Sequence, residues 1–274
     1  TIFACGMTGS GKTHTMNGTP TDPGVVPNAA DFLFDALPRL RASVRRAELY
    51  VSTFEIYDDK IVDLCSPAHI KRSAVGEKDA ASLLLLREDA VRTALALYRD
   101  PAKWAFSIRP VDRRRSTGET KLNSASSRSH LVVQFLLLQQ QYPSAPTTSS
   151  QQPPPLTRYS KITLVDLAGS ENNKHTGNAG KRMTESAAIN GSLFHLSRVI
   201  DALAEKQRGV ENVHVPYSHS KLTAALKDAL GGSAQSLMIA TVSPLVRFTE
   251  ETRRTLDFVV KSRTIVNAAT TNDI

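Results

Sequence analysis

The chain has 274 residues, of which 41% are hydrophobic, so it can bury one large core or two smaller ones. Its only two cysteines, Cys5 and Cys65, lie far apart without C-x-x-C spacing, so they suggest neither a disulfide framework nor a zinc site. This cysteine usage fits a reducing compartment, the cytoplasm or the nucleus. The longest apolar runs are too short to span a membrane, and the net charge of +8 favours a polyanionic partner such as nucleic acid, an acidic membrane surface or an acidic protein filament.

A glycine-rich segment, Gly6–Thr13, follows the short apolar run Ile2–Cys5. It fits the phosphate-binding pattern G-x-x-x-x-G-K-[ST], in which glycines let successive backbone N–H groups point at the phosphates of a nucleotide. In that pattern Lys12 reaches the β and γ phosphates, and Thr13 offers its hydroxyl to Mg²⁺. A plain glycine- and serine-rich turn is the alternative, which a strand before the segment and a helix after it disfavour. The predicted phosphate-binding residues are Gly6, Met7, Thr8, Gly9, Ser10, Gly11, Lys12 and Thr13.

Helices and strands are predicted to alternate along the rest of the chain. One helix should begin at residues 13–16, and the apolar spacing after Asn28 predicts a second helix that ends before Pro38. A turn is expected at Asp58 and Asp59, directly after the first of four predicted strands. These strands, rich in apolar and β-branched residues, cover residues 50–57, 131–138, 161–166 and 236–242.

Three further helices are predicted in the second half of the chain. A long amphipathic helix covers residues 184–205, a shorter one covers 220–230 and stops at a pair of glycines, and Thr249 should cap the last. The alternation of strands and helices predicts an α/β fold, with a central, mostly parallel sheet flanked by helices on both faces.

Two segments are harder to assign. Residues 66–115 contain a candidate strand at 83–86 and a candidate helix at 90–99, and their arginine cluster at 109–115 is either functional or an ordinary solvated surface. Residues 139–157 consist only of Gln, Pro, Ser, Thr, Ala, Tyr and Leu, a composition that buries too little apolar surface to fold. They predict a low-complexity hairpin insertion without chemistry of its own.

Two polar stretches beside predicted strands supply what a phosphate loop needs for hydrolysis: a γ-phosphate sensor, a complete Mg²⁺ shell and a positioned water. Residues 123–130 combine hydroxyls, an amide and a guanidinium just before a strand. Residues 166–171 follow a strand, where Asp166 would face Mg²⁺ through water and the Gly169 amide would bond the γ-phosphate. Either stretch alone reads as a polar turn, but in combination with the phosphate loop they favour a nucleotide switch.

Together these motifs resemble a kinesin motor domain. The phosphate loop continues through Met16 as in the kinesin pattern G-x-T-G-[SA]-G-K-T-[HY]-T-M, with Met7 where the family usually has Gln. Residues 66–112 match only loosely. The other matching stretches, in family order, are N-x-x-S-S-R-S-H at 123–130, D-L-A-G-S-E at 166–171, I-N-K-S-L at 189–193, V-P-Y-R-D-S-K-L-T at 215–223, L-G-G…MIA-x-x-S-P at 230–244, and the last motor helix with the start of the neck linker at 251–267.

The resemblance implies a P-loop NTPase, an ATP-hydrolysing microtubule motor, over residues 1–267, with its first strands expected upstream and residues 268–274 starting the neck linker or a tail. The implied cofactors are ATP and Mg²⁺, the latter held by Thr13 and Ser127 and, through water, by Asp166. The residues implied to act on the γ-phosphate and the attacking water are Asn123, Ser126, Arg128, Gly169 and Glu171, with an ion pair between Glu171 and Arg128.

Two further roles follow from the resemblance: His14 would lie beside the adenine, and Asn190 would relay closure of the site to the long helix. The implied partner is the acidic face of a microtubule, rather than nucleic acid or an inserted membrane. A microtubule partner places the protein on the cytoplasmic cytoskeleton. The resemblance also allows a homodimer formed through a stalk. The implied contact residues are Lys174, Lys181, Arg182, Lys206, Arg208 and Lys221.

Three departures from the family pattern remove positive charge from that contact surface. Gly191 stands at the lysine of I-N-K-S, Ser218 at the arginine of V-P-Y-R, and Ala224 at the arginine that often follows K-L-T. They leave open a second function, a binding module that holds microtubules or another partner without productive ATP cycling. A third, an unrelated P-loop GTPase or helicase, is disfavoured because neither an Asn-Lys-x-Asp nor an Asp-Glu-x-Asp motif occurs in the sequence.

Overall fold

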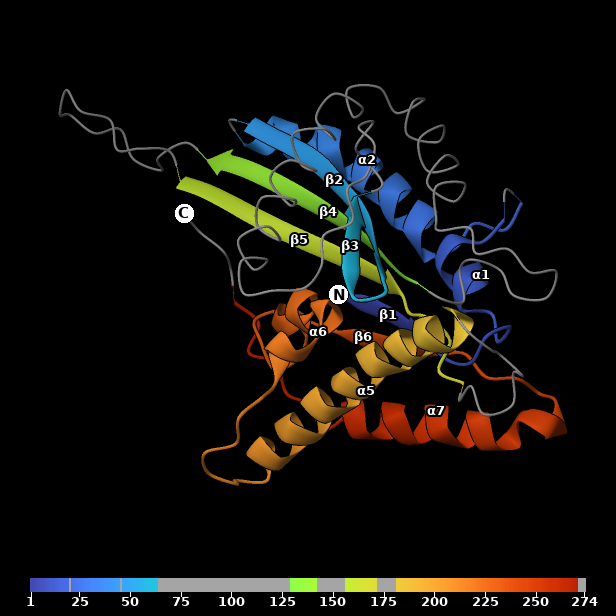
Figure 1. Ribbon diagram of the computed structural model, residues 1–274. Coiled ribbons are helices and arrows are strands. Elements are labelled where there is room, and N and C mark those ends of the chain that lie inside the picture. The colour runs from blue at the N-terminus through green and yellow to red at the C-terminus, as the bar shows by residue number, and fades with distance from the viewer. Residues whose placement is uncertain (20, 45, 64–128, 142–155, 172–180, 271–274) are drawn as a thin grey trace.

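The computed structural model describes residues 1–19, 21–44, 46–63, 129–141, 156–171 and 181–270, with the backbone alone at Leu156 and over residues 181–190. A six-stranded sheet in the order β3-β2-β4-β5-β1-β6 forms its centre (Figure 1). Its strands are β1 (Ile2–Cys5), β2 (Arg46–Tyr57), β3 (Lys60–Asp63), β4 (His130–Gln141), β5 (Leu156–Asp166) and β6 (Leu237–Ala240). The helices are α1 (Lys12–Asn17), α2 (Val25–Ser43), α5 (Lys181–Gln207), α6 (Lys221–Ala225) and α7 (Thr249–Ser262), with short 3-10 turns η3 (Tyr217–His219), η4 (Lys227–Ala229) and η5 (Val246–Phe248).

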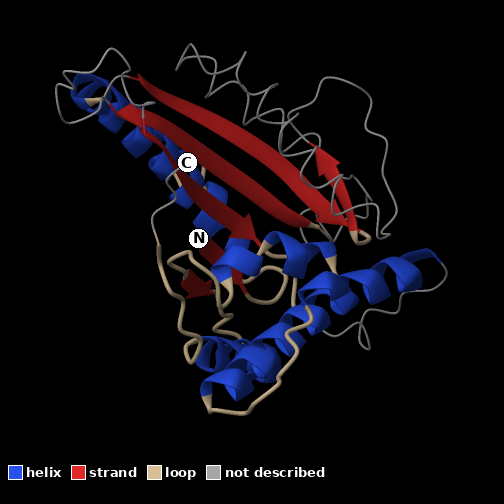
Figure 2. Ribbon diagram, turned by 90° about the vertical axis from the view of Figure 1, so that its left-hand side faces the viewer, coloured by secondary structure: helices blue, strands red, loops and turns tan. Residues whose placement is uncertain are grey.

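Alternating side chains along the strands build one hydrophobic core on each face of the sheet. Phe3 and Cys5 of β1 pack toward α5, α6 and α7, whereas Ala4 between them packs toward α1 and α2. Figure 1 and the turned view in Figure 2 show the same arrangement, with α2 along one face of the sheet and the α5–α7 group on the other. The predicted α/β P-loop fold with helices on both faces is therefore confirmed.

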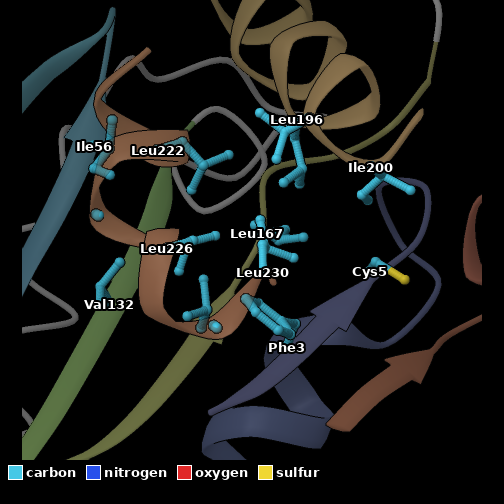
Figure 3. Packing of buried hydrophobic residues seen from close by; sticks show 14 of the residues in the cluster. Phe3, Cys5, Ile56, Val132, Leu167, Leu196, Ile200, Leu222, Leu226 and Leu230 are labelled. Carbon is cyan, nitrogen blue, oxygen red and sulfur yellow. The ribbon is translucent and has the colours of Figure 1, made fainter. Parts of the chain in front are cut away.

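The core beneath α5 joins this helix to the strand that precedes the phosphate loop. Leu196 and Ile200, four residues apart on α5, point into the same cluster as Leu222 of α6 and Phe3 of β1 (Figure 3). All four side chains are at most 2% exposed. Because interiors are packed as densely as organic crystals, α5 cannot move far without disturbing this contact to the site.

The sheet is mixed, which corrects the expectation of a mostly parallel one. β1 pairs in parallel with β5 and β6, but β2 pairs antiparallel with both β3 and β4, and β4 pairs antiparallel with β5. A two-residue turn joins β2 to β3, and both of its residues have left-handed backbones, with φ of 51° at Asp58 and 50° at Asp59. Such a turn matches the twist of an antiparallel hairpin and leaves no room for the crossover that parallel strands need.

The same turn supports α6 on the neighbouring surface. The backbone N–H of Lys221, the first residue of α6, donates to the Asp59 carboxylate at 2.8 Å. Burial of the carboxyl group raises the pKa of Asp59, against the lowering effect of the Lys221 amide and of the charges on Lys221 and His195. The side chain of Asp59 therefore satisfies a helix-terminal donor that would otherwise lack an acceptor.

We expect Asp59→Ala to destabilise the protein by about 1 kcal/mol, the usual cost of losing a helix-capping acceptor. Asp58→Ala is the matched control, because it introduces the same left-handed alanine in the same turn but loses only the exposed ion pair to Lys60. Urea unfolding of both variants measures the difference. Equal loss of stability in the two variants would show that the contact with Lys221 contributes nothing.

The bounds of two predicted helices are wrong. α2 does not end before Pro38 but continues to Ser43. The apolar face of α2, with Val26, Ala30 and Leu37 buried, continues across the proline, and its burial outweighs the local helix-breaking preference. The predicted helix over 220–230 is divided into α6 and η4, because Leu226 leaves the helical region at φ −99° and ψ 7°.

The strands beside the predicted hairpin insertion are longer than expected. Gln139 pairs with Arg158, and Gln141 with Leu156, so the ladder between β4 and β5 runs past residue 138. The rest of the predicted insertion, residues 142–155, lies outside the described residues, as do the candidate elements within 66–115. Thr249 also differs from its predicted role, because its hydroxyl donates to the Val246 carbonyl at 2.6 Å instead of accepting a helix N–H.

Among the residues that the structure describes, no helix combines the length and the apolar character that a membrane span requires.

Candidate nucleotide site

The phosphate loop connects the end of β1 to the first turn of α1. Gly6 has φ of 152°, and a Cβ atom on it would collide with the carbonyl oxygen of Thr241 behind the loop. Gly11, the residue before α1, has a left-handed backbone with φ of 105°. The Ser10 hydroxyl closes the loop, because it donates to the Met7 carbonyl at 2.8 Å and lies 2.6 Å from the Thr241 hydroxyl. The glycines are therefore required by the backbone shape of this loop.

Lys12 lies across the phosphate loop rather than in solvent. Its side chain is buried, with 6% of the residue exposed. The ammonium group donates to the carbonyl oxygens of Gly6 and Met7, both at 2.9 Å. These bonds compensate the charge for its loss of water and hold it at the centre of the loop, where phosphate oxygens would meet it.

Two of the three residues predicted to hold Mg²⁺ lie side by side. The Thr13 hydroxyl at the start of α1 donates to the Asp166 carboxylate at the end of β5, at 2.7 Å. Asp166 is only 2% exposed. A hydroxyl and a carboxylate are hard oxygen donors of the kind that Mg²⁺ prefers, so this pair fits the ion. The third predicted residue, Ser127, lies outside the described residues.

The segment after β5 packs directly against the phosphate loop. The Thr8 backbone N–H donates to one carboxylate oxygen of Glu171 at 2.8 Å, and the Thr8 hydroxyl donates to the other. Gly169 lies beneath this contact, where a Cβ atom would collide with both Thr8 and Glu171. The Ser170 N–H also donates to the Gly6 carbonyl at 3.2 Å. The structure thus joins the phosphate loop to the predicted γ-phosphate sensor.

Sequence reasoning missed Thr8 as a partner of Glu171 and gave no role to His130. The Ala168 N–H donates to His130 Nδ1 at 3.0 Å, and His130 Nε2 lies 2.8 Å from the Ser192 hydroxyl on α5. His130 had a sequence signal, since it ends the motif at 123–130. The contact between Thr8 and Glu171 had none, because residues 163 positions apart meet only after folding.

The other predicted site residues are distributed as follows. His14 lies on the exposed side of α1, with its Nε2 atom 3.6 Å from the Asp22 carboxylate. Lys206 and Arg208 are exposed around the end of α5, but Lys221 is only 8% exposed and therefore adds little to that surface. Asn123, Ser126, Ser127, Arg128 and Lys174 lie outside the described residues, as do the side chains of Lys181, Arg182 and Asn190.

Comparisons with known proteins agree with this architecture. A sequence model of the kinesin motor domain matches residues 1–265. The chain is 38% identical over 280 residues to the kinesin-like protein KIF22 of Rattus norvegicus, and 40% identical over 274 residues to KIF22 of Danio rerio. These matches cover 99% and 97% of this chain, but in each case only 39% of the relative, so the chain spans well under half of those proteins.

Two solved structures share the fold over almost the whole chain. A KIF14 dimer in a two-heads-bound state with AMP-PNP, in complex with a microtubule, superposes with a TM-score of 0.78 at 31% identity, covering 99% of this chain and 73% of that one. The structure of a fast kinesin superposes with a TM-score of 0.72 at 28% identity, covering 100% and 72%. The fold, the phosphate loop and the sequence match agree, and this chain belongs to the kinesin motor-domain family.

Proposed function

We propose that this chain is the ATP-hydrolysing part of a microtubule motor, which couples γ-phosphate sensing to movement along microtubules or to their remodelling. The observation that carries the proposal is the pair of direct links between the phosphate loop and the 166–171 segment, from Thr13 to Asp166 and from Thr8 to Glu171. A nucleotide that enters this loop competes for the same N–H and hydroxyl donors. Its γ-phosphate therefore has a direct means of displacing the segment.

In this proposal each residue binds or positions, and none forms a covalent bond to the phosphate. Lys12 binds the β and γ phosphates, and the Gly169 amide senses the γ-phosphate. Thr13, Ser127 and, through water, Asp166 hold Mg²⁺, which when bound offsets negative charge on the phosphate oxygens. The attacking water is positioned by Asn123, Ser126 and the ion pair between Arg128 and Glu171, and His14 lies beside the adenine.

The contacts of α7 and of the segment after it support a mechanical output. Lys261 of α7 forms an ion pair with Asp201 of α5 at 3.0 Å. The Asn267 side chain donates to the carbonyl oxygens of Ala229 at 2.9 Å and Ala234 at 2.6 Å. The predicted start of the neck linker thus lies against η4 and the turn after it, and α7, which precedes it, is paired with α5, so a displacement of α5 would act on the linker through α7.

The microtubule is the proposed partner, with the cytoplasmic cytoskeleton as the site of action. Exposed Lys206 and Arg208 support this proposal, as does the relative KIF14, whose structure contains a microtubule. Lys174, Lys181 and Arg182 remain proposed contacts, and Asn190 a proposed relay to α5. A homodimer through a stalk likewise remains a proposal.

The alternative is a module that binds microtubules without productive cycling, which the three charge-reducing departures at Gly191, Ser218 and Ala224 favour. Cosedimentation of the full-length protein with microtubules separates the two functions. A motor is expected to bind several-fold more tightly with AMP-PNP than with ADP, because its filament affinity depends on the nucleotide state. Equal binding with both nucleotides, together with no ATP hydrolysis, would favour the module.

We expect Gly191→Lys to tighten microtubule binding roughly three- to tenfold at low salt, with the gain falling as salt screens the added charge. The position has room, since a Cβ atom on Gly191 meets nothing within 4 Å. Gly191→Ala is the matched control, because it gains the same helix propensity without the charge. Cosedimentation at two salt concentrations measures both variants, and equal affinities for lysine and alanine would exclude Gly191 from the contact surface.

A further inference from the structure

One buried imidazole connects three elements of the motor. His130 is the first residue of β4 and is 2% exposed. On one side it accepts the N–H of Ala168, the residue before the proposed γ-phosphate sensor, at 3.0 Å. On the other side it lies 2.8 Å from the hydroxyl of Ser192, which is 5% exposed on α5. A single side chain therefore touches both the sensor segment and the helix that the proposed function places at the microtubule.

The hydrogen-bond partners of His130 determine which of its ring nitrogens carries the proton. A backbone N–H can only donate, so the His130 Nδ1 atom that it meets must be an acceptor without a proton. The remaining proton of a neutral imidazole then sits on Nε2, which donates to the Ser192 hydroxyl. The three groups form one directed chain, from the Ala168 amide through the ring to Ser192. Because the ring is rigid, a change of position at one end alters the hydrogen bond at the other.

The surroundings of this hydrogen-bond chain permit a change in the position of Ala168. A cavity of about 340 Å³ lies between the sensor segment, α5 and α7, and its lining includes Ala168, Ser170 and Leu193. The segment at residues 166–171 therefore has space beside it, whereas His130 is fixed by the strand that it begins. Movement of Ala168 into this cavity would change its bond to the ring without first displacing a packed side chain.

We propose that His130 and Ser192 are positioning residues that couple the γ-phosphate state to the placement of α5, and so set how strongly microtubule affinity depends on the nucleotide. This inference rests on the proposed function. It assigns neither residue to the chemistry: the proposal rests on the hydrogen bonds of His130 to Ala168 and to Ser192, and Ala168 is not one of the phosphate-binding residues proposed above. The two hydrogen bonds provide the physical link that a claim of coupling requires.

Ser192→Ala in the full-length protein tests the link, because it removes only the hydroxyl that meets the ring. We expect the ratio of microtubule Kd with ADP to that with AMP-PNP to fall by about threefold, toward one, the effect of losing a single hydrogen bond from one of the two states. ATP turnover without microtubules should stay within about twofold of wild type, since the hydroxyl is outside the phosphate site. Ser192→Thr, which retains a hydroxyl, should restore the wild-type ratio.

Ser197→Ala is the matched control, since it makes the same change five residues further along α5 and lines the same cavity, but is not part of this hydrogen-bond chain. It should leave the ratio of Kd values unchanged. A wild-type ratio in Ser192→Ala would overturn the inference while leaving the motor function intact. A wild-type protein whose microtubule affinity does not depend on the nucleotide would overturn the proposed function and this inference together.

Discussion

Replacing Lys12 by alanine is expected to lower microtubule-stimulated ATP turnover by at least about 100-fold, the usual loss when one preorganised charged donor is removed from a reacting phosphate. The structure adds a second reason. The Lys12 ammonium also joins the Gly6 and Met7 carbonyls, so the alanine variant leaves two carbonyl oxygens without this donor and relaxes the loop. Nucleotide affinity and turnover should therefore fall together.

The control for this variant is Lys60→Ala. Lys60 pairs with Asp58 on the surface, far along the chain from the phosphate loop, and its loss should leave turnover within about twofold of wild type. Nucleotide binding followed by fluorescence, turnover with and without microtubules, and thermal unfolding together separate a catalytic loss from a folding loss. Turnover within threefold of wild type in a folded Lys12→Ala protein would exclude the phosphate-loop assignment.

Replacing Glu171 by glutamine is the second change with a large expected effect. It removes the negative charge that accepts both bonds from Thr8 and that is proposed to pair with Arg128, so turnover should fall about 100-fold. Nucleotide affinity should change much less, because Glu171 holds the sensor segment rather than the phosphates. Single-turnover measurements separate the two effects.

Thr8→Val separates the effect of the Thr8 hydroxyl bond to Glu171 from that of the proposed ion pair between Glu171 and Arg128. It preserves the shape of the side chain and the backbone N–H bond at 2.8 Å, and removes only the hydroxyl bond. Turnover should fall about tenfold or less, in line with one lost hydrogen bond. If Thr8→Val were as inactive as Glu171→Gln, the role of Glu171 would lie in its bond to the Thr8 hydroxyl, and the proposed ion pair would be unnecessary. Normal turnover in Glu171→Gln would contradict both roles.

The sequence predicted correctly those elements whose structure depends on interactions between residues close together in the chain. The strand from 131 to 138 and the phosphate loop were both predicted, because alternation, β-branched content and glycine spacing act over a few residues. The prediction of a mostly parallel sheet was wrong, since strand pairing joins residues far apart, as with the antiparallel partners Phe54 and Val132. The mixed sheet follows from which strands become neighbours. Two features of the sequence indicated antiparallel pairs: the turn at Asp58 and Asp59, and the hairpin predicted over 139–157.

Burial and side-chain pairing explain the remaining differences. Lys221 was expected at the microtubule contact because of the family resemblance, but η3 and the β2–β3 turn pack around the start of α6 and leave it 8% exposed. The chain from Ala168 through His130 to Ser192 joins residues 38 and 62 positions apart, which no pattern along the sequence encodes. Such contacts, rather than the motifs themselves, provide candidate connections between a nucleotide site and a distant surface.

The most direct test of the central claim is ATP turnover by the full-length protein as microtubule concentration is raised. The proposed motor predicts slow turnover alone and a saturable increase of at least about tenfold with microtubules, lost entirely in Lys12→Ala. Turnover that microtubules leave unchanged, or that persists in the Lys12→Ala variant, would contradict the account, because hydrolysis would then be uncoupled from the filament or would not belong to this phosphate loop.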